Sequence, residues 1–268
     1  MIRLPDANSW GYQTGNTLTT RPTAAAGFGT SITPGNNTYG SYASILAGGS
    51  IVYDCYWVEV CINTNTVAAA ARDTIVTIGV DQTGGTSYTD LIPNLLASCA
   101  ASYGTSYNGV GYSFPLFVKA GSQLAAKASI NNATVGTLRV SIKLYGQPSR
   151  PDSIWWGSSV EAIGINTGTS AGTDVTSGTT SEGSWTSLGT SAQRCCYWQL
   201  GAGINNATMS TFGYHLDIAT GDASNKTVIL QDVPMITTSA EVLSLMQGPA
   251  WFDVPAGGTL YARAQCSS

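Results

Sequence analysis

The chain contains a single histidine, and His215 lies two residues before Asp217. In an extended strand, residues two apart point to the same face, so this pair has the arrangement of a general base oriented by a carboxylate. A serine nucleophile would complete that chemistry, but the sequence has no Gly-x-Ser-x-Gly motif to present one. We therefore expect a strand histidine that is satisfied by a neighbouring carboxylate, and no catalytic residue.

Aspartates in the second half of the chain raise the question of a calcium site. Asp217, Asp222, Asp232 and Asp253 lack the spacing of an EF-hand loop. The sequence also lacks the His-Glu-x-x-His, P-loop and dinucleotide-binding motifs. The other acids are scattered, so no carboxylate pair for glycoside hydrolysis can be assigned. The sequence predicts no metal, no cofactor and no enzyme.

Six cysteines are spread along the chain without a Cys-x-x-Cys pair. A disulfide between the adjacent Cys195 and Cys196 would be strained, because neighbouring strand residues point to opposite faces. We expect buried reduced thiols that pack as small apolar groups. A bridge from Cys61 to Cys55 or to Cys99 is the alternative in an oxidising medium.

Aromatic residues are the remaining candidates for recognition, and one group lies in Gly- and Ser-rich arms. Large aromatics in such arms need to be buried, either against their own domain or in a neighbouring subunit, where Trp and Arg dominate interface energetics. The candidate interface residues are Ile2, Arg3, Leu4, Trp10, Tyr12, Trp155 and Trp156.

A second aromatic group surrounds the Gly-rich stretch at residues 103–109. Tyrosine gives contact area, while Gly and Ser give adaptability, as in known recognition loops. The matching stretch of the second half is shorter, around Gln247 and Gly248. The candidate recognition residues are Tyr103, Tyr107 and Tyr112.

The chain is internally duplicated, so the elements that position the candidate residues occur in two copies. The spacing between matching residues drifts slightly along the chain, as loop deletions would cause, so the sequence predicts two copies of one domain. The main matches are Gly29-Thr30 with Gly172-Thr173, Gly40-Ser41-Tyr42 with Gly183-Ser184-Trp185, Cys55-Tyr56-Trp57 with Cys196-Tyr197-Trp198, and residues 118–128 with residues 254–264.

Each copy follows an arm, and Trp10-Gly11 of the first arm matches Trp156-Gly157 of the second. The predicted organisation is an arm over residues 1–26, a first β-sandwich over 27–148, a linker or second arm over 149–171, and a second β-sandwich over 172–268.

The first copy continues through an alternating segment at residues 138–145 that has no match in the second copy. The second domain is therefore expected to lack its closing strand. Because an uncovered sheet edge recruits another strand, we expect residues 2–20 of the same chain or of a neighbour to fill the gap.

Hydrophobic alternation with a period of two recurs throughout both copies, whereas helical periodicity is nearly absent. Helical turns are expected at most at residues 89–101 and 239–246. The sequence predicts an all-β fold of tandem duplicated antiparallel β-sandwich domains, jelly-roll-like, with an extended N-terminal arm. An immunoglobulin-like sandwich is the rival.

Only 10% of the residues are charged and 43% are hydrophobic. Interface cores are depleted of charge, so this composition favours a protein that is covered by copies of itself, although adhesins and sugar-binding modules share it. A net charge of -4 without any basic run argues against nucleic-acid binding. No segment is apolar enough to span a membrane or to serve as a secretory signal, and we expect synthesis in the cytoplasm.

This charge-poor tandem sandwich, with its Val-x-Ala-Gly turns at residues 118–121 and 254–257, resembles virion structural proteins of tailed bacteriophages. Capsid decoration (cement) and head-fibre proteins with jelly-roll domains are the nearest class, and the resemblance covers residues 29–144 and 172–268. It implies a virion protein without enzymatic activity, nucleic acid or membrane, which forms a homotrimer and clamps neighbouring subunits of the major capsid protein through residues 1 to about 25.

The alternative is a tail or baseplate protein, or a surface carbohydrate-binding module. In that case Tyr103, Tyr107 and Tyr112, or Trp155 and Trp156, would stack on the faces of a glycan.

Overall fold

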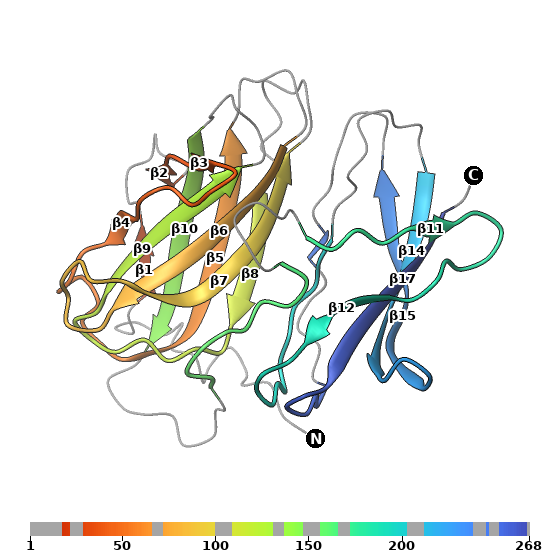
Figure 1. The fold of residues 1–268 in the computed structure, drawn as a ribbon. Coiled ribbons are helices and arrows are strands. Elements are labelled where there is room, and N and C mark those ends of the chain that lie inside the picture. Colours follow the sequence, from red (N-terminus) through yellow and green to blue (C-terminus); the bar gives the residue numbers. More distant parts are fainter. Residues whose placement is uncertain are drawn as a thin grey trace.

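The computed structural model describes residues 18–21, 29–65, 72–99, 109–130, 137–146, 156–165, 172–202, 212–237, 245–246 and 252–266. Within these ranges the chain forms strands and no helix, which confirms the predicted all-β fold of β-sandwich type (Figure 1). Accordingly, the described residues contain no helix that is long and apolar enough to cross a membrane.

The first domain packs two sheets against each other. One has the order β1 (Leu18–Arg21), β10 (Thr137–Gly146), β5 (Cys55–Asn65) and β8 (Gly109–Phe114), with β2 (Thr30–Ile32) also beside β10. The other has the order β3 (Gly35–Asn36), β9 (Gln123–Ile130), β6 (Arg72–Asp81) and β7 (Thr89–Cys99), with β4 (Ala43–Leu46) also beside β9. The core lies between them and includes Val60, Ile142, Ile78 and Leu124, all fully buried.

The second domain repeats the second of these sheets strand for strand. Its order is β11 (Ser177–Gly178), β17 (Thr259–Cys266), β14 (Phe212–Gly221) and β15 (Lys226–Thr237), with β12 (Thr186–Thr190) beside β17. β11 pairs parallel to β17, just as β3 pairs parallel to β9. The duplication seen in the sequence is therefore a duplication of topology.

The opposing sheet of the second domain is much smaller. It consists of β13 (Gly201–Ala202) and β16 (Leu245–Met246), which pair as β5 and β8 do in the first domain. In the described part of the chain, no strand of the second domain matches β1, β2 or β10. β10 has Leu138, Val140, Ile142 and Leu144 on its buried face, so its counterpart is the strand that would close the second core.

Two sequence expectations are wrong in detail. Residues 89–99 form strand β7 rather than a helical turn: Asn94 has a left-handed φ of 56° at a bulge, which disturbs the alternation on either side. The match of Cys55 is Cys195 and not Cys196, because Cys55 pairs with Val118 and Cys195 pairs with Val254 in equivalent bridges.

Candidate functional site

The linker between the copies docks on the first domain like an added strand. Gly157 N donates to Pro115 O (2.7 Å), and Phe117 N donates to Gly157 O (3.2 Å). Between these bonds, Leu116 forms a parallel bridge with Gly157 and is only 1% exposed. The linker thus covers an apolar position of the first copy.

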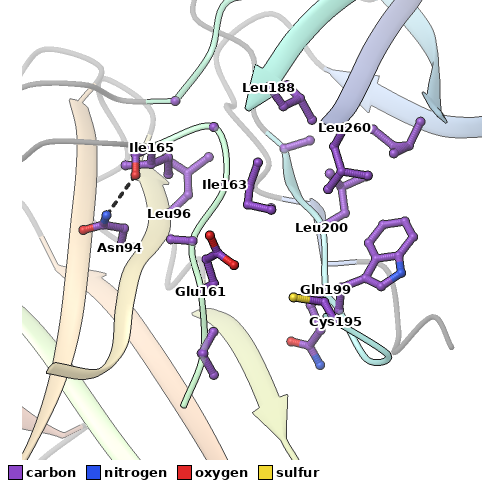
Figure 2. Close-up of a pocket in the computed structure, with 18 of the residues that line it drawn as sticks. Asn94, Leu96, Glu161, Ile163, Ile165, Leu188, Cys195, Gln199, Leu200 and Leu260 are labelled. Carbon is purple, nitrogen blue, oxygen red and sulfur yellow. Dashed lines mark hydrogen bonds between the residues drawn. The ribbon is translucent and has the colours of Figure 1, made fainter. Parts of the chain in front are cut away.

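Further along, the linker follows the outer edge of β7. Val160 N donates to Leu91 O (3.3 Å), and Asn94 Nδ2 donates to Ile165 O (2.9 Å) (Figure 2). Ile165 is buried against Leu96. An edge strand that would otherwise expose its backbone is therefore protected within the chain.

The same linker holds the second domain in place. Glu161 accepts hydrogen bonds from Ser191 Oγ (3.0 Å) and Ala192 N (2.8 Å) through its two carboxylate oxygens. A second contact joins β8 to the segment before β13, where Ser113 N donates to Gln199 Oε1 (3.1 Å) and Tyr197 Oη donates to Ser113 O (2.6 Å). β8 is thus the edge of the first domain that faces the second copy (Figure 1).

A cavity of about 690 Å³ lies between the linker, the first domain and the second domain. Ile163 of the linker faces Leu188, Leu200 and Leu260 of the second domain across it (Figure 2). In the first domain the equivalent inner face is covered by β5 and β10. The cavity is the space that remains because the described part of the second domain has only β13 and β16 in their place.

The walls of this cavity suit apolar groups more than a polar substrate. Glu161 and Gln199 line it, but both are engaged in the hydrogen bonds just described. The thiol of Cys195 lies at the same wall, 3.3 Å from Ser191 Oγ. The described lining contains no histidine and no pair of uncommitted carboxylates that could serve as acid and base.

A charged cluster lies on the outer face of the second domain. Arg263 of β17 donates to Asp217 of β14 from Nε (3.0 Å) and Nη2 (2.8 Å), and it also pairs with Glu182. The second oxygen of Asp217 accepts from Asp232 N (2.7 Å), and the guanidinium stacks on Trp185 at 4.4 Å. The carboxylates of Glu182, Asp217 and Asp232 lie within 4.8 Å of one another, and Arg263 is the counter-ion of Glu182 and Asp217.

Hydrogen bonding and desolvation move the pKa values in this cluster in opposite directions. Burial disfavours the charged form of Asp217, but the bonds from Asp232 N and Arg263 outweigh it and lower the pKa of Asp217. Desolvation and a hydrogen bond to Asp217 raise the pKa of Glu182.

The first domain has an equivalent cluster, in which Lys127 pairs with Asp90 (2.9 Å) and a neutral residue stands at the position of Asp217. Lys127 replaces Arg263 and lies over the ring of Tyr42 at 4.7 Å, as Arg263 lies over Trp185. Thr77 replaces Asp217, and its Oγ1 accepts from Asn94 N (3.1 Å). The copies have kept the geometry of this face and changed its charge.

The structure places His215 and the four aspartates considered in the sequence at separate contacts. Asp217 is not the partner of His215, whose Nδ1 lies 3.9 Å from Asp232 with both side chains more than half exposed. Asp222 instead accepts bonds from the turn at Ser224 N and Asn225 N (both 2.7 Å). Asp253 pairs with Arg194 (2.7 Å). The four aspartates therefore do not form one site.

One candidate interface residue, Trp156, and one candidate recognition residue, Tyr112, serve packing within the chain. Trp156 lies against Tyr56, with ring centroids 4.9 Å apart. Tyr112 belongs to β8 and is 4% exposed, with its hydroxyl donating to Leu96 O (2.6 Å), so its assignment to an exposed recognition loop is wrong. The other candidates lie outside the described residues, namely Ile2, Arg3, Leu4, Trp10, Tyr12, Tyr103, Tyr107 and Trp155.

Sequence reasoning missed Phe252, which is 38% exposed. Phe252 lies two residues before Val254, as Leu116 lies two residues before Val118, and both valines pair with the matching cysteines. The two positions are therefore equivalent. Aligning the copies on the valines would have identified this residue.

Cys55 and Cys61 are both free thiols, so the alternative bridge between them is absent, and Cys195 and Cys196 are free as well. Cys55 is buried, as expected, whereas Cys196 is exposed. Burial raises the pKa of the Cys55 thiol to about 12, with a further contribution from Asp54.

A scan against models of protein families gave no match, and a search of curated protein sequences gave none. Among solved structures, the chain is similar to PNGF-II in two crystal forms, with TM-scores of 0.38 and 0.36 and 10% sequence identity, over 93% of this chain and 61% of that chain. It is also similar to the PBSX exported protein XepA, with a TM-score of 0.27 and 11% identity, over 98% of this chain and 89% of that chain. TM-scores this low do not establish a shared fold, so nothing about function follows from them.

Proposed function

We propose that this chain is a non-enzymatic structural protein of a tailed-phage virion, and specifically a capsid decoration protein that oligomerises and clamps neighbouring subunits of the capsid. The observation that carries the proposal is that the second sandwich is incomplete over the residues that the structure describes. Its apolar inner face lines a cavity of about 690 Å³ instead of packing on a full second sheet. Leaving apolar surface exposed to water costs a free energy of about 25 cal/mol per Å². Exposed apolar surfaces therefore mark sites of protein association.

The charged groups support a structural role as well. Arg263, Asp217 and Glu182 satisfy one another on the outer face of the second domain, and Glu161 fixes the linker to that domain. Only 10% of the residues are charged, and the cores of protein interfaces are likewise depleted of charged residues.

Binding of the purified chain to phage heads that lack it tests this proposal. A decoration protein should co-sediment with the heads, saturate at a fixed number of copies and raise the temperature at which the heads disrupt. Absence of binding to heads would refute the decoration role. Recovery of the chain in a tail fraction, or its retention on a glycan array, would instead support the alternatives.

A further inference from the structure

The two copies share a docking position that is filled in only one of them. In the first domain, Leu116 lies beneath Gly157 of the linker and is 1% exposed. In the second domain, the equivalent Phe252 is 38% exposed, and its ring lies 6.0 Å from that of Trp198. Among the described residues, no backbone hydrogen bond joins Phe252 to another segment.

The adjacent strand edge shows the same difference. Val160 of the linker bonds to Leu91 at the outer edge of β7. The equivalent strand β15 pairs with β14 on one side, and no described segment pairs with its other edge. Val228 of β15 is 41% exposed. In the first domain one linker covers both of the equivalent positions, and an unpaired strand edge with an exposed aromatic side chain at such positions is a receptor for a further strand.

The sequence contains a segment that matches the docked linker. Trp10-Gly11 precedes the first copy as Trp156-Gly157 precedes the second, and Pro5-Asp6 matches Pro151-Asp152. The linker docks on the copy that comes before it. By the same relation, the N-terminal arm fits the unfilled docking position of a second domain.

The place where the arm joins the first domain also favours a neighbour. β1 pairs with β10 at one edge of its sheet, and β8 is the opposite edge, where the chain's own second domain binds through Ser113. The arm therefore joins the sandwich on the side remote from its own second domain.

We infer that the N-terminal arm of a second copy of this chain docks on the second domain at Phe252, with Trp10-Gly11 in the role that Trp156-Gly157 has on the first domain. The contact is heterologous, so molecules join head to tail and close into a ring where the geometry permits. The inference deepens the self-assembly part of the proposed function and names the partner surface, but it does not depend on binding to a capsid.

Light scattering and sedimentation of the purified full-length chain test this contact. Phe252→Asp and Trp10→Ala should each weaken self-association at least 10-fold, because aromatic anchors dominate such interfaces. Val52→Asp is the matched control: Val52 is 58% exposed on the first domain, and its substitution should leave assembly unchanged.

Mixing the two defective variants gives the sharpest result. The intact arm of the Phe252→Asp variant should bind the intact second domain of the Trp10→Ala variant, so the mixture forms heterodimers while each variant alone stays monomeric. Such heterodimers show that the second domain of the Trp10→Ala variant is folded, and circular dichroism checks the fold of the Phe252→Asp variant. A monomeric wild-type chain, normal assembly of either variant, or a mixture without heterodimers would overturn the inference. Assembly as expected without binding to phage heads would refute only the decoration role.

Discussion

Arg263 and Asp217 form an ion pair on the outer face of the second domain, at positions that Lys127 and Thr77 occupy in the first domain. Two guanidinium nitrogens of Arg263 donate to one carboxylate oxygen of Asp217, whose side chain is only 3% exposed. The acid partner of the basic residue thus lies at a different position in each copy, Asp217 for Arg263 and Asp90 for Lys127. Both copies keep a backbone bulge in the neighbouring strand, at Asn94 in one and Asp232 in the other.

Arg263→Met should lower the free energy of unfolding by about 3 kcal/mol, because it leaves the buried carboxylate of Asp217 without its counter-ion. The control is Lys127→Met, since the partner of Lys127 is Asp90, whose side chain is 47% exposed. A pair of this kind contributes up to about 1 kcal/mol. Urea denaturation measures the unfolding free energy of both variants. Equal losses of stability in the two variants would contradict the assignment of Arg263 as the counter-ion of a buried carboxylate.

Asp81 makes the first domain sensitive to acid. Its carboxylate accepts bonds from Thr83 Oγ1 (2.6 Å), Thr83 N (2.8 Å) and Ser87 N (2.8 Å), and these bonds lower its pKa. The resulting stability is present above the unfolded pKa of about 3.9 and is lost as pH falls through the lower folded value. Denaturation at several pH values between 2 and 6 should therefore show a steeper loss for the wild type than for Asp81→Asn, and parallel curves would exclude this role.

Leu116→Ala should cost about 2–5 kcal/mol of stability, because it opens a cavity beneath the linker. Phe252→Ala should cost about 1 kcal/mol or less when measured at a protein concentration low enough to keep the chain monomeric, since the ring is already 38% exposed. The comparison separates folding from assembly at two equivalent positions. A larger loss at Phe252 than at Leu116 would show that their environments are assigned wrongly.

Thiol labelling should distinguish the cysteines of the two copies. Iodoacetamide at pH 8 should modify the exposed Cys196 in the native protein. Cys55 should react only after unfolding, because it is 3% exposed and its pKa is about 12. Peptide mass spectrometry gives the labelled fraction of each cysteine, and labelling of Cys55 in the native protein would contradict the packing of β5.

The sequence predicts the sandwich where one face of a strand is buried and the other is not. β10 is the clearest case, because Leu138, Val140, Ile142 and Leu144 alternate with half-buried neighbours as expected. β7 was missed because Leu91, Ile92, Leu95 and Leu96 are all buried around the bulge at Asn94, and this spacing imitates a helix.

The candidate site was harder to predict than the fold. The exposure of Phe252 depends on which copy the linker covers, and that is a property of the domain arrangement rather than of local sequence. The burial of Tyr112 has a different origin, because its strand β8 packs this side chain into the core of the first domain. A tyrosine next to a Gly-rich stretch has the composition of a surface loop whichever way its strand faces.

Photo-crosslinking from position 252 tests the central claim most directly. A benzophenone amino acid at this position, in an equal mixture of ¹⁴N- and ¹⁵N-labelled chains, reports which peptide covers the site and whether it belongs to another molecule. We expect mixed-isotope crosslinks to a peptide from residues 1–17. Crosslinks confined to one isotope, or to peptides outside that segment, would contradict head-to-tail assembly through the N-terminal arm.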